Sequence, residues 1–75
     1  MKVRIFGILT DVLKCSEMEM HVVSDTDTFK KVLYEKYPVL KDHTFQITLN
    51  SEKVTKNILL NENDEIALLP PFAGG

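Results

Sequence analysis

The end of the chain carries the residues whose types and spacing point most clearly to chemistry. Residues 70–75 are Pro-Pro-Phe-Ala-Gly-Gly, and this segment holds two of the three prolines and two of the three glycines. Glycine has no side chain, so a diglycine can enter a channel too narrow for any other dipeptide. Paired prolines keep the approach to it extended and cannot continue a helix. The pattern predicts a tail that presents the terminal carboxylate of Gly75 to the active site of another protein.

Length and composition limit the rest of the molecule to one small domain. The chain has 75 residues, of which 44% are hydrophobic and 27% are charged, as is ordinary for a soluble globular protein. A domain of this size builds one thin core and has no room for a deep catalytic cavity. The net charge is −2 and no basic cluster is present, which argues against binding to nucleic acid.

The cellular setting follows from the cysteine content and from the apolar segments. Cys15 is the only cysteine, so it cannot form an internal disulfide, which favours a reducing compartment. No apolar run approaches the roughly 18 residues needed to cross a bilayer, and the first residues do not form a signal peptide. We therefore expect a cytoplasmic protein that does not bind membranes.

Other side chains that could do chemistry have a simpler interpretation. His21, His43 and Cys15 lack the close spacing of metal ligands, so we expect no metal site. Cys15 is interpreted as a small apolar filler, because only one basic residue, Lys14, is near it in sequence to make the thiol reactive. No phosphate-binding loop, dinucleotide fingerprint or nucleophile elbow is present. We expect that the chain is not an enzyme by itself.

The first half of the chain predicts two strands and a helix. Residues 1–9 alternate between apolar and polar side chains, as do residues 17–22, which indicates two strands that form a hairpin. Residues 24–28 are rich in helix-capping types. Apolar side chains then recur at helical spacing from Phe29 to Tyr37, and Pro38 ends the helix.

The second half predicts three more strands. Residues 45–49 alternate clearly, and residues 54–60 form a short, irregular fourth strand after a turn. Asn63 lies in the next turn and is expected to adopt a left-handed conformation. Residues 65–69 are nearly all apolar, as in a central strand covered on both faces.

This order of elements predicts an α+β protein with the ubiquitin-like β-grasp fold. A mixed sheet of about five strands would carry one main helix across one face, and the last strand would run parallel to the first at the sheet's centre. We divide the chain into a β-grasp domain over residues 1–69 and an extended tail over residues 70–75. A tail that leaves a central strand is firmly anchored at its first residue.

The last strand and the tail carry a resemblance to a known family. Residues 64–75, Asp-Glu-Ile-Ala-Leu-Leu-Pro-Pro-Phe-Ala-Gly-Gly, resemble the end of the small subunit of molybdopterin synthase. Thr48-Leu49-Asn50 is also similar to a Val-Asn segment of that family. Asn63 stands where the family usually has glycine, and Phe72 replaces a smaller aliphatic residue.

The resemblance implies a carrier of sulfur. In that family an E1-like adenylyltransferase activates the terminal carboxylate, here that of Gly75, with ATP and Mg²⁺, so this chain would bind no cofactor itself. A sulfur donor such as a cysteine desulfurase or a rhodanese-type protein then converts the adenylate into a thiocarboxylate. The large subunit of molybdopterin synthase receives the tail and transfers the sulfur to cyclic pyranopterin monophosphate. The resemblance implies a heterotetramer of two large and two small subunits.

Two sets of residues are expected to contact these partners. The tail residues enter the partner's active site: Pro70, Pro71, Phe72, Ala73 and Gly74. Phe6, Ile8 and Leu69 form a docking patch for the large subunit or the activating enzyme, or else lie beneath loops of their own domain. Phe72 would be buried against a partner or pack back on its own domain.

Three other functions remain open from the sequence. The sulfur carrier of thiamine thiazole synthesis shares the fold, the diglycine and the activation, although the Pro-Pro-Phe segment argues against it. A ubiquitin-like modifier would join Gly75 to lysines of other proteins by isopeptide bonds. A non-covalent interaction domain would have no use for the tail.

Overall fold

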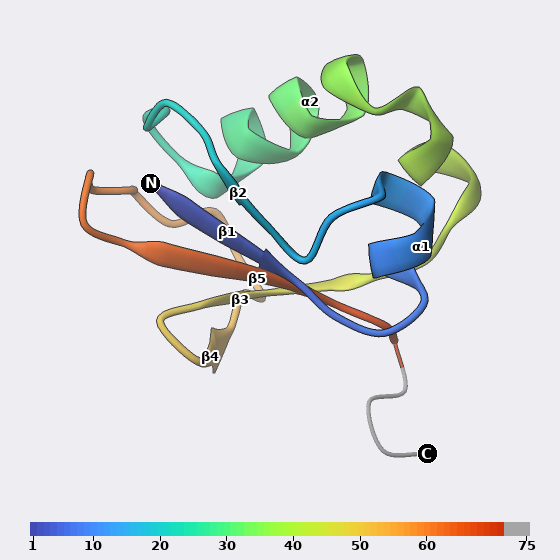
Figure 1. Ribbon diagram of the computed structural model, residues 1–75. Helices are drawn as coiled ribbons and strands as arrows, with labels where there is room; N and C mark the ends of the chain where they lie inside the picture. The colour runs from blue at the N-terminus through green and yellow to red at the C-terminus, as the bar shows by residue number, and fades with distance from the viewer. Residues whose placement is uncertain (72–75) are drawn as a thin grey trace.

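The computed structural model describes residues 1–71 and consists of one five-stranded sheet with helices on one side (Figure 1). The first half contains strand β1, helix α1, strand β2, helix α2 and the 3-10 helix η1, with the bounds Lys2–Ile5, Leu9–Leu13, Glu17–Glu19, Thr26–Lys36 and Pro38–Asp42. The second half contains strands β3, β4 and β5, with the bounds Gln46–Leu49, Glu52–Lys53 and Glu65–Leu69.

The sheet has the strand order β2-β1-β5-β3-β4. Strand β5 lies at its centre and runs parallel to β1, with Ile5 opposite Leu68, and antiparallel to β3, with Gln46 opposite Leu69. The predicted β-grasp arrangement, with a mixed sheet and a parallel central last strand, is confirmed.

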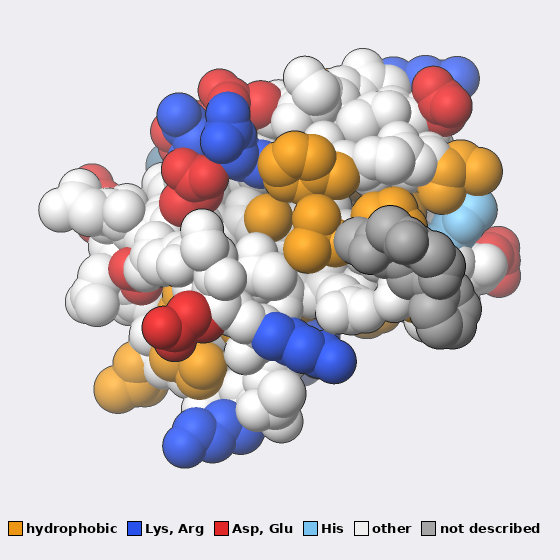
Figure 2. Space-filling model, turned by 90° about the horizontal axis from the view of Figure 1, so that it is seen from below, with side chains coloured by type: hydrophobic (Ala, Val, Ile, Leu, Met, Phe, Trp, Pro, Cys, Tyr) orange, Lys and Arg blue, Asp and Glu red, His pale blue; other side chains and the backbone are white. Residues whose placement is uncertain are grey.

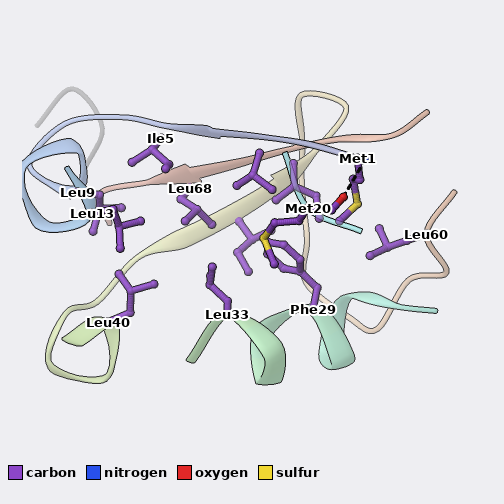
Figure 3. Packing of buried hydrophobic residues seen from close by; sticks show 13 residues of the cluster. Met1, Ile5, Leu9, Leu13, Met20, Phe29, Leu33, Leu40, Leu60 and Leu68 are labelled. Carbon is purple, nitrogen blue, oxygen red and sulfur yellow. Dashed lines mark hydrogen bonds between the residues drawn. The ribbon is translucent and has the colours of Figure 1, made fainter. Parts of the chain in front are cut away.

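The core lies between the sheet and α2 (Figure 3). Phe29 and Leu33 lie one helical turn apart on α2, point toward the sheet and are fully buried. They meet Val3, Ile66 and Leu68 from the two central strands, which are fully buried as well. Burial of a side chain of this kind stabilises the fold by roughly 1.5–3 kcal/mol.

Helix α2 begins where the sequence predicts it. Asp25 has an extended backbone, and its Oδ1 accepts a hydrogen bond of 2.9 Å from the backbone N–H of Thr28, as in a standard N-cap. Asn57, from the distant segment before β5, accepts a second N–H at 2.9 Å from Asp27. The side chain of Asn57 also donates to Asp25 at 3.1 Å. The backbone N–H of Ile58 donates to Oγ1 of Thr26 as well, so residues 57 and 58 are both bound to the start of the helix.

The alternation predicted one strand over residues 1–9, and this prediction is wrong. Strand β1 ends at Ile5, because Gly7 adopts φ +62° and turns the chain away from the sheet. Helix α1 follows, and Leu9 and Leu13 are buried at an i, i+4 spacing that also suits a helix. Strands β1 and β2 pair as predicted, but α1 lies between them.

Two further predictions about the second half are wrong. Residues 54–60 form no strand beyond a single bridge between Asp25 and Leu59, because Asn57 and Ile58 bind the start of α2. The fourth strand is Glu52–Lys53 instead. Positive φ occurs at Asn50 and Ser51 rather than at Asn63. Asn50 closes the tight turn between β3 and β4.

Strand β5 is covered fully on one face only. Ile66 and Leu68 point toward α2 and are buried, whereas Ala67 and Leu69 on the other face are half-buried. The prediction of complete cover on both faces is therefore wrong, because the helices lie on one side of the sheet. The other side leaves part of β5 accessible to a partner.

The start of β5 depends on the ionised carboxylate of Asp64. The side chain of Asn50 donates to Asp64 at 2.9 Å and the backbone N–H of Asn61 donates at 2.7 Å, and both bonds hold the pKa of Asp64 below its usual value. Because the pKa is lower in the folded state, the ionised carboxylate stabilises the folded protein at pH values above the unfolded-state pKa. This contribution is lost as pH falls through the folded-state pKa.

A pH titration of stability tests this role of Asp64. The free energy of unfolding of the wild type should exceed that of Asp64→Asn at neutral pH, and the difference should shrink as pH falls below about 4. Urea denaturation of both proteins between neutral and strongly acidic pH measures it. A difference that stays constant down to the acid limit would contradict the assignment.

Candidate functional site

The candidate site is the point where the chain leaves the sheet. Strand β5 ends at Leu69, and Pro70 and Pro71, which we call the tail root, follow directly. The tail root therefore starts from the central strand of the sheet, which is paired with a strand on each side. The other predicted tail residues, Phe72, Ala73, Gly74 and Gly75, lie outside the described residues.

Gly7 makes close contact with the tail root from the β1 side. Phe6 donates its backbone N–H to the carbonyl oxygen of Leu68 at 3.1 Å, so the parallel pairing reaches the end of β5. One residue further on, a Cβ atom at Gly7 would lie 2.5 Å from Cγ of Pro70. The ring of Pro70 therefore occupies the space that any other side chain at residue 7 would need.

Gln46 contacts the tail root from the β3 side. Its side-chain Nε2 donates a hydrogen bond to the carbonyl oxygen of Pro71. Gln46 also pairs with Leu69 in the last register position of β3 and β5. The tail root is thus held by a turn on one side and by a side-chain amide on the other.

Replacement of Gly7 by alanine is expected to destabilise the protein and to displace the tail root. A non-glycine residue at φ +62° costs about 1 kcal/mol or more, and the collision with the rigid ring of Pro70 adds to this cost. We expect Gly7→Ala to lower the free energy of unfolding by about 2–4 kcal/mol, as measured by urea denaturation.

The double variant Gly7→Ala/Pro70→Ala is the matched control. Removal of the ring should relieve the collision but not the backbone strain, so part of the lost stability should return. If Gly7→Ala were as stable as the wild type, this would contradict the close contact between residue 7 and the ring of Pro70. If the double variant were no more stable than Gly7→Ala, the contribution of the Pro70 ring would be wrong.

A hydrophobic patch lies next to the tail root on the face of the sheet opposite α2. Phe6, Ala67 and Leu69 form this patch and line one shallow hollow of about 300 Å³. Phe6 is 42% exposed. Figure 2 shows hydrophobic side chains gathered on this face. Of the three predicted docking residues, the structure brings Phe6 and Leu69 together, whereas Ile8 is 63% exposed and does not line the hollow.

Charged side chains border this patch toward the start of β5. Arg4 lies between two carboxylates, with Nη1 3.6 Å from Glu65 and Nε 3.9 Å from Glu17. Arg4 and Glu65 also line the hollow. Surface ion pairs of this kind contribute little to stability, but they give the rim of the patch a mixed charge with both signs.

The other chemical groups considered in the sequence do not gather into a site. Within residues 1–71, no three or more His, Cys, Asp or Glu side chains are close enough to hold a metal ion. Cys15 is a half-buried free thiol that packs against the core. No helix in the described part of the chain is both long and apolar enough to cross a membrane.

Comparison with known families matches nearly the whole chain, tail included. The profile of the ThiS family covers residues 3–75. The chain belongs to the ThiS family. A relative from Mycobacterium tuberculosis, the molybdopterin synthase sulfur carrier subunit, is 33% identical over 61 residues, which are 79% of this chain and 74% of the relative.

Solved structures show the same ubiquitin-like fold. The small archaeal modifier protein 1 of Methanosarcina acetivorans matches with a TM-score of 0.80 at 24% identity, over 99% of this chain and 94% of that one. The corresponding protein of Haloferax volcanii matches with a TM-score of 0.77 at 21% identity, over 99% and 97%. These two show the fold alone.

A third structure is a complex of subunits 1 and 2 of the molybdopterin-converting factor from Helicobacter pylori. It matches with a TM-score of 0.75 at 31% identity, over 99% of this chain and 96% of that one. The predicted membership of the sulfur carrier family is therefore confirmed.

Two contacts of the site were not found in the sequence. Gly7 is the only glycine outside the tail, and this isolation was a usable signal that a turn or a close approach occurs there. Gln46 gave no such signal, because a polar residue at the edge of an alternating strand looks solvated. Its role depends on the register of β3 against β5, which is a tertiary feature.

Proposed function

We propose that this protein is the sulfur carrier subunit of a molybdopterin synthase, with Gly75 as the residue that carries the sulfur. The observation that supports this most is the position of the tail root at the end of the central strand. Strand β5 ends at Leu69, the tail root follows, and the family profile includes the sequence of residues 70–75. The domain would hold the tail while other proteins load and unload its end.

The chemistry at Gly75 would proceed through activation of a poor acyl donor. The terminal carboxylate attacks the α-phosphate of ATP and releases pyrophosphate, which gives an acyl adenylate with a good leaving group. The terminal sulfur of a donor persulfide then displaces AMP, which gives an acyl disulfide between Gly75 and the donor. A thiol attacks the donor's sulfur atom of this S–S bond, so that the thiocarboxylate leaves and the thiol and the donor sulfur form a disulfide. ATP and Mg²⁺ are bound by an E1-like adenylyltransferase, and this chain binds neither.

The sulfur would then reach a pterin in the large subunit. Six extended residues span about 20 Å, which lets the tail cross the rim of the large subunit and bring Gly75 to cyclic pyranopterin monophosphate. Each delivery returns Gly75 to a carboxylate, and two deliveries complete the dithiolene of molybdopterin. We propose that the chain is a non-catalytic subunit and that these steps take place in the cytoplasm.

The hydrophobic patch is the surface we assign to the partner. Phe6 and Leu69 leave apolar area accessible beside the tail root, and exposed aromatic groups of this kind are frequent in interfaces. The relative from Helicobacter pylori is found in a complex of two subunits of molybdopterin-converting factor. A heterotetramer of two large and two small chains is the assembly we propose.

Co-purification with the large subunit followed by an assay of molybdopterin formation tests the proposal. The thiocarboxylated form of the chain should convert cyclic pyranopterin monophosphate to molybdopterin when the large subunit is present. The plain carboxylate form is the matched control, and it should bind the large subunit and give no product.

Two results would contradict this function. One is product formation by the carboxylate form without an added sulfur source. The other is a thiocarboxylated chain that supports thiamine thiazole formation and not molybdopterin formation. Lysine-linked adducts in a denaturing gel, without any sulfur transfer, would instead indicate a protein modifier.

A further inference from the structure

The hydrogen-bond ladder between β3 and β5 has an unusual end. Its last register pair is Gln46 opposite Leu69. Beyond this pair the chain continues into Pro70 and Pro71, which have no backbone N–H and therefore cannot donate to a neighbouring strand. The side-chain amide of Gln46 instead donates a hydrogen bond to the carbonyl oxygen of Pro71, which remains available as an acceptor. Contact between the two segments thus extends two residues past the strand.

The opposite side of the tail root has a steric contact in place of a hydrogen bond. β1 runs parallel to β5, and the last register pair is Ile5 opposite Leu68. The backbone N–H of Phe6 then donates a hydrogen bond to the carbonyl oxygen of Leu68. At the next residue, Gly7, the ring of Pro70 occupies the space that a side chain would need. Pro70 cannot shift toward β1, and Pro71 is bound on the side of β3.

We propose that Gln46 is a positioning residue that sets the direction in which the tail leaves the sheet, with Gly7 making room for Pro70 on the other side. Proline has a fixed φ, and the residue before a proline is restricted to extended conformations, so the direction of the chain is set from Leu69 to Pro71, where the rest of the tail begins. This inference rests on the proposed function, because the direction matters only if Gly75 must enter a partner's active site.

The expected effect of Gln46 is on binding and not on the chemical step. A tail held in the productive direction binds without a further ordering cost. When only a fraction of molecules has this direction, the apparent dissociation constant rises by the inverse of that fraction. One neutral hydrogen bond changes such an equilibrium about two- to tenfold. Loss of the bond should therefore raise KM and leave kcat unchanged.

The kinetic test uses Gln46→Glu in the full chain, with the activating enzyme and ATP. Glutamate has nearly the shape of glutamine, but its ionised form has no donor for the carbonyl of Pro71. We expect KM of the activating enzyme for the carrier to rise about two- to tenfold, with kcat unchanged and the thermal midpoint lowered by only a few degrees. Gln46→Leu, which adds no charge, should raise KM to a similar extent.

Asn63→Asp is the matched control variant. It makes the same change from amide to carboxylate at an exposed position before the other end of β5, and KM should stay at the wild-type value. An unchanged KM in both Gln46 variants would overturn the positioning role. A rise in KM that occurs in Gln46→Glu and Asn63→Asp but not in Gln46→Leu would also overturn it, since charge alone would then explain the effect.

A structural readout separates this inference from the proposed function. The side-chain amide signal of Gln46 in a ¹H–¹⁵N NMR spectrum should shift when the chain is truncated after Pro70, because its acceptor is gone. An unchanged signal would overturn the contact whatever the activity is. If the wild-type chain is not activated at all while the signal shifts, the proposed function and the positioning role both fail and the contact alone remains.

Discussion

Deletion of Gly75 is expected to abolish thiocarboxylate formation and molybdopterin synthesis while the domain stays folded. The variant still ends in a carboxylate, on Gly74, but that group lies about 3.5 Å closer to the sheet. Reacting groups must be placed to within a fraction of this distance for efficient catalysis. The free energy of unfolding should stay within about 0.5 kcal/mol of the wild type, because the deleted residue lies beyond the end of β5.

A chain with an amide at Gly75 distinguishes the effect of tail length from the effect of the terminal carboxylate. A protein of 75 residues can be assembled by chemical ligation, and the amidated form has the length of the wild type without the carboxylate. It should bind the large subunit with wild-type affinity and never be adenylated. Normal sulfur loading of the deletion variant would contradict the role of Gly75 as the reactive end. Unfolding of this variant would contradict the prediction that the domain is stable without Gly75.

Replacement of each of two adjacent leucines on β5 by alanine is expected to affect a different property of the protein, stability for Leu68 and binding to the large subunit for Leu69. Leu68 has no exposed surface and faces the core below α2, whereas Leu69 faces the hydrophobic patch on the other side of the sheet. Leu68→Ala should lower the free energy of unfolding by about 2–5 kcal/mol, since it removes buried methyl groups and leaves a cavity. This is a large part of the stability of a small domain.

Leu69→Ala is the matched control, with the same change one residue further along the strand. We expect it to cost less than about 1.5 kcal/mol of stability and to weaken binding to the large subunit about tenfold or more, as for a residue in the centre of an interface. Urea denaturation and titration calorimetry measure the two effects. A larger loss of stability from Leu69→Ala than from Leu68→Ala would contradict the assigned faces of β5.

The parts of the fold that could be predicted are those with a strong local pattern. Helix α2 has both a cap at Asp25 and a buried stripe at helical spacing, and β5 is a run of five residues rich in apolar side chains. Their types and order were enough to predict the parallel central strand. The tail was recognised because its glycines and prolines stand out in composition.

The parts that failed depend on contacts between distant segments. The spacing of Leu9 and Leu13 fits a helix and, in part, a strand, and the turn at Gly7 decides between them. Residues 54–60 looked like a strand because of their apolar content, but Asn57 and Ile58 bind the start of α2. A polar network of this kind has no local signature, so sequence patterns could not reveal it.

The terminal mass of the protein isolated from its native cell tests the central claim most directly. Intact-mass analysis should find a population heavier by the difference between one sulfur and one oxygen atom, and fragmentation should place this change on Gly75. The population should grow when the large subunit is absent and unloading stops. A terminus that carries only oxygen under that condition, while molybdopterin synthesis proceeds normally once the large subunit is restored, would contradict the account.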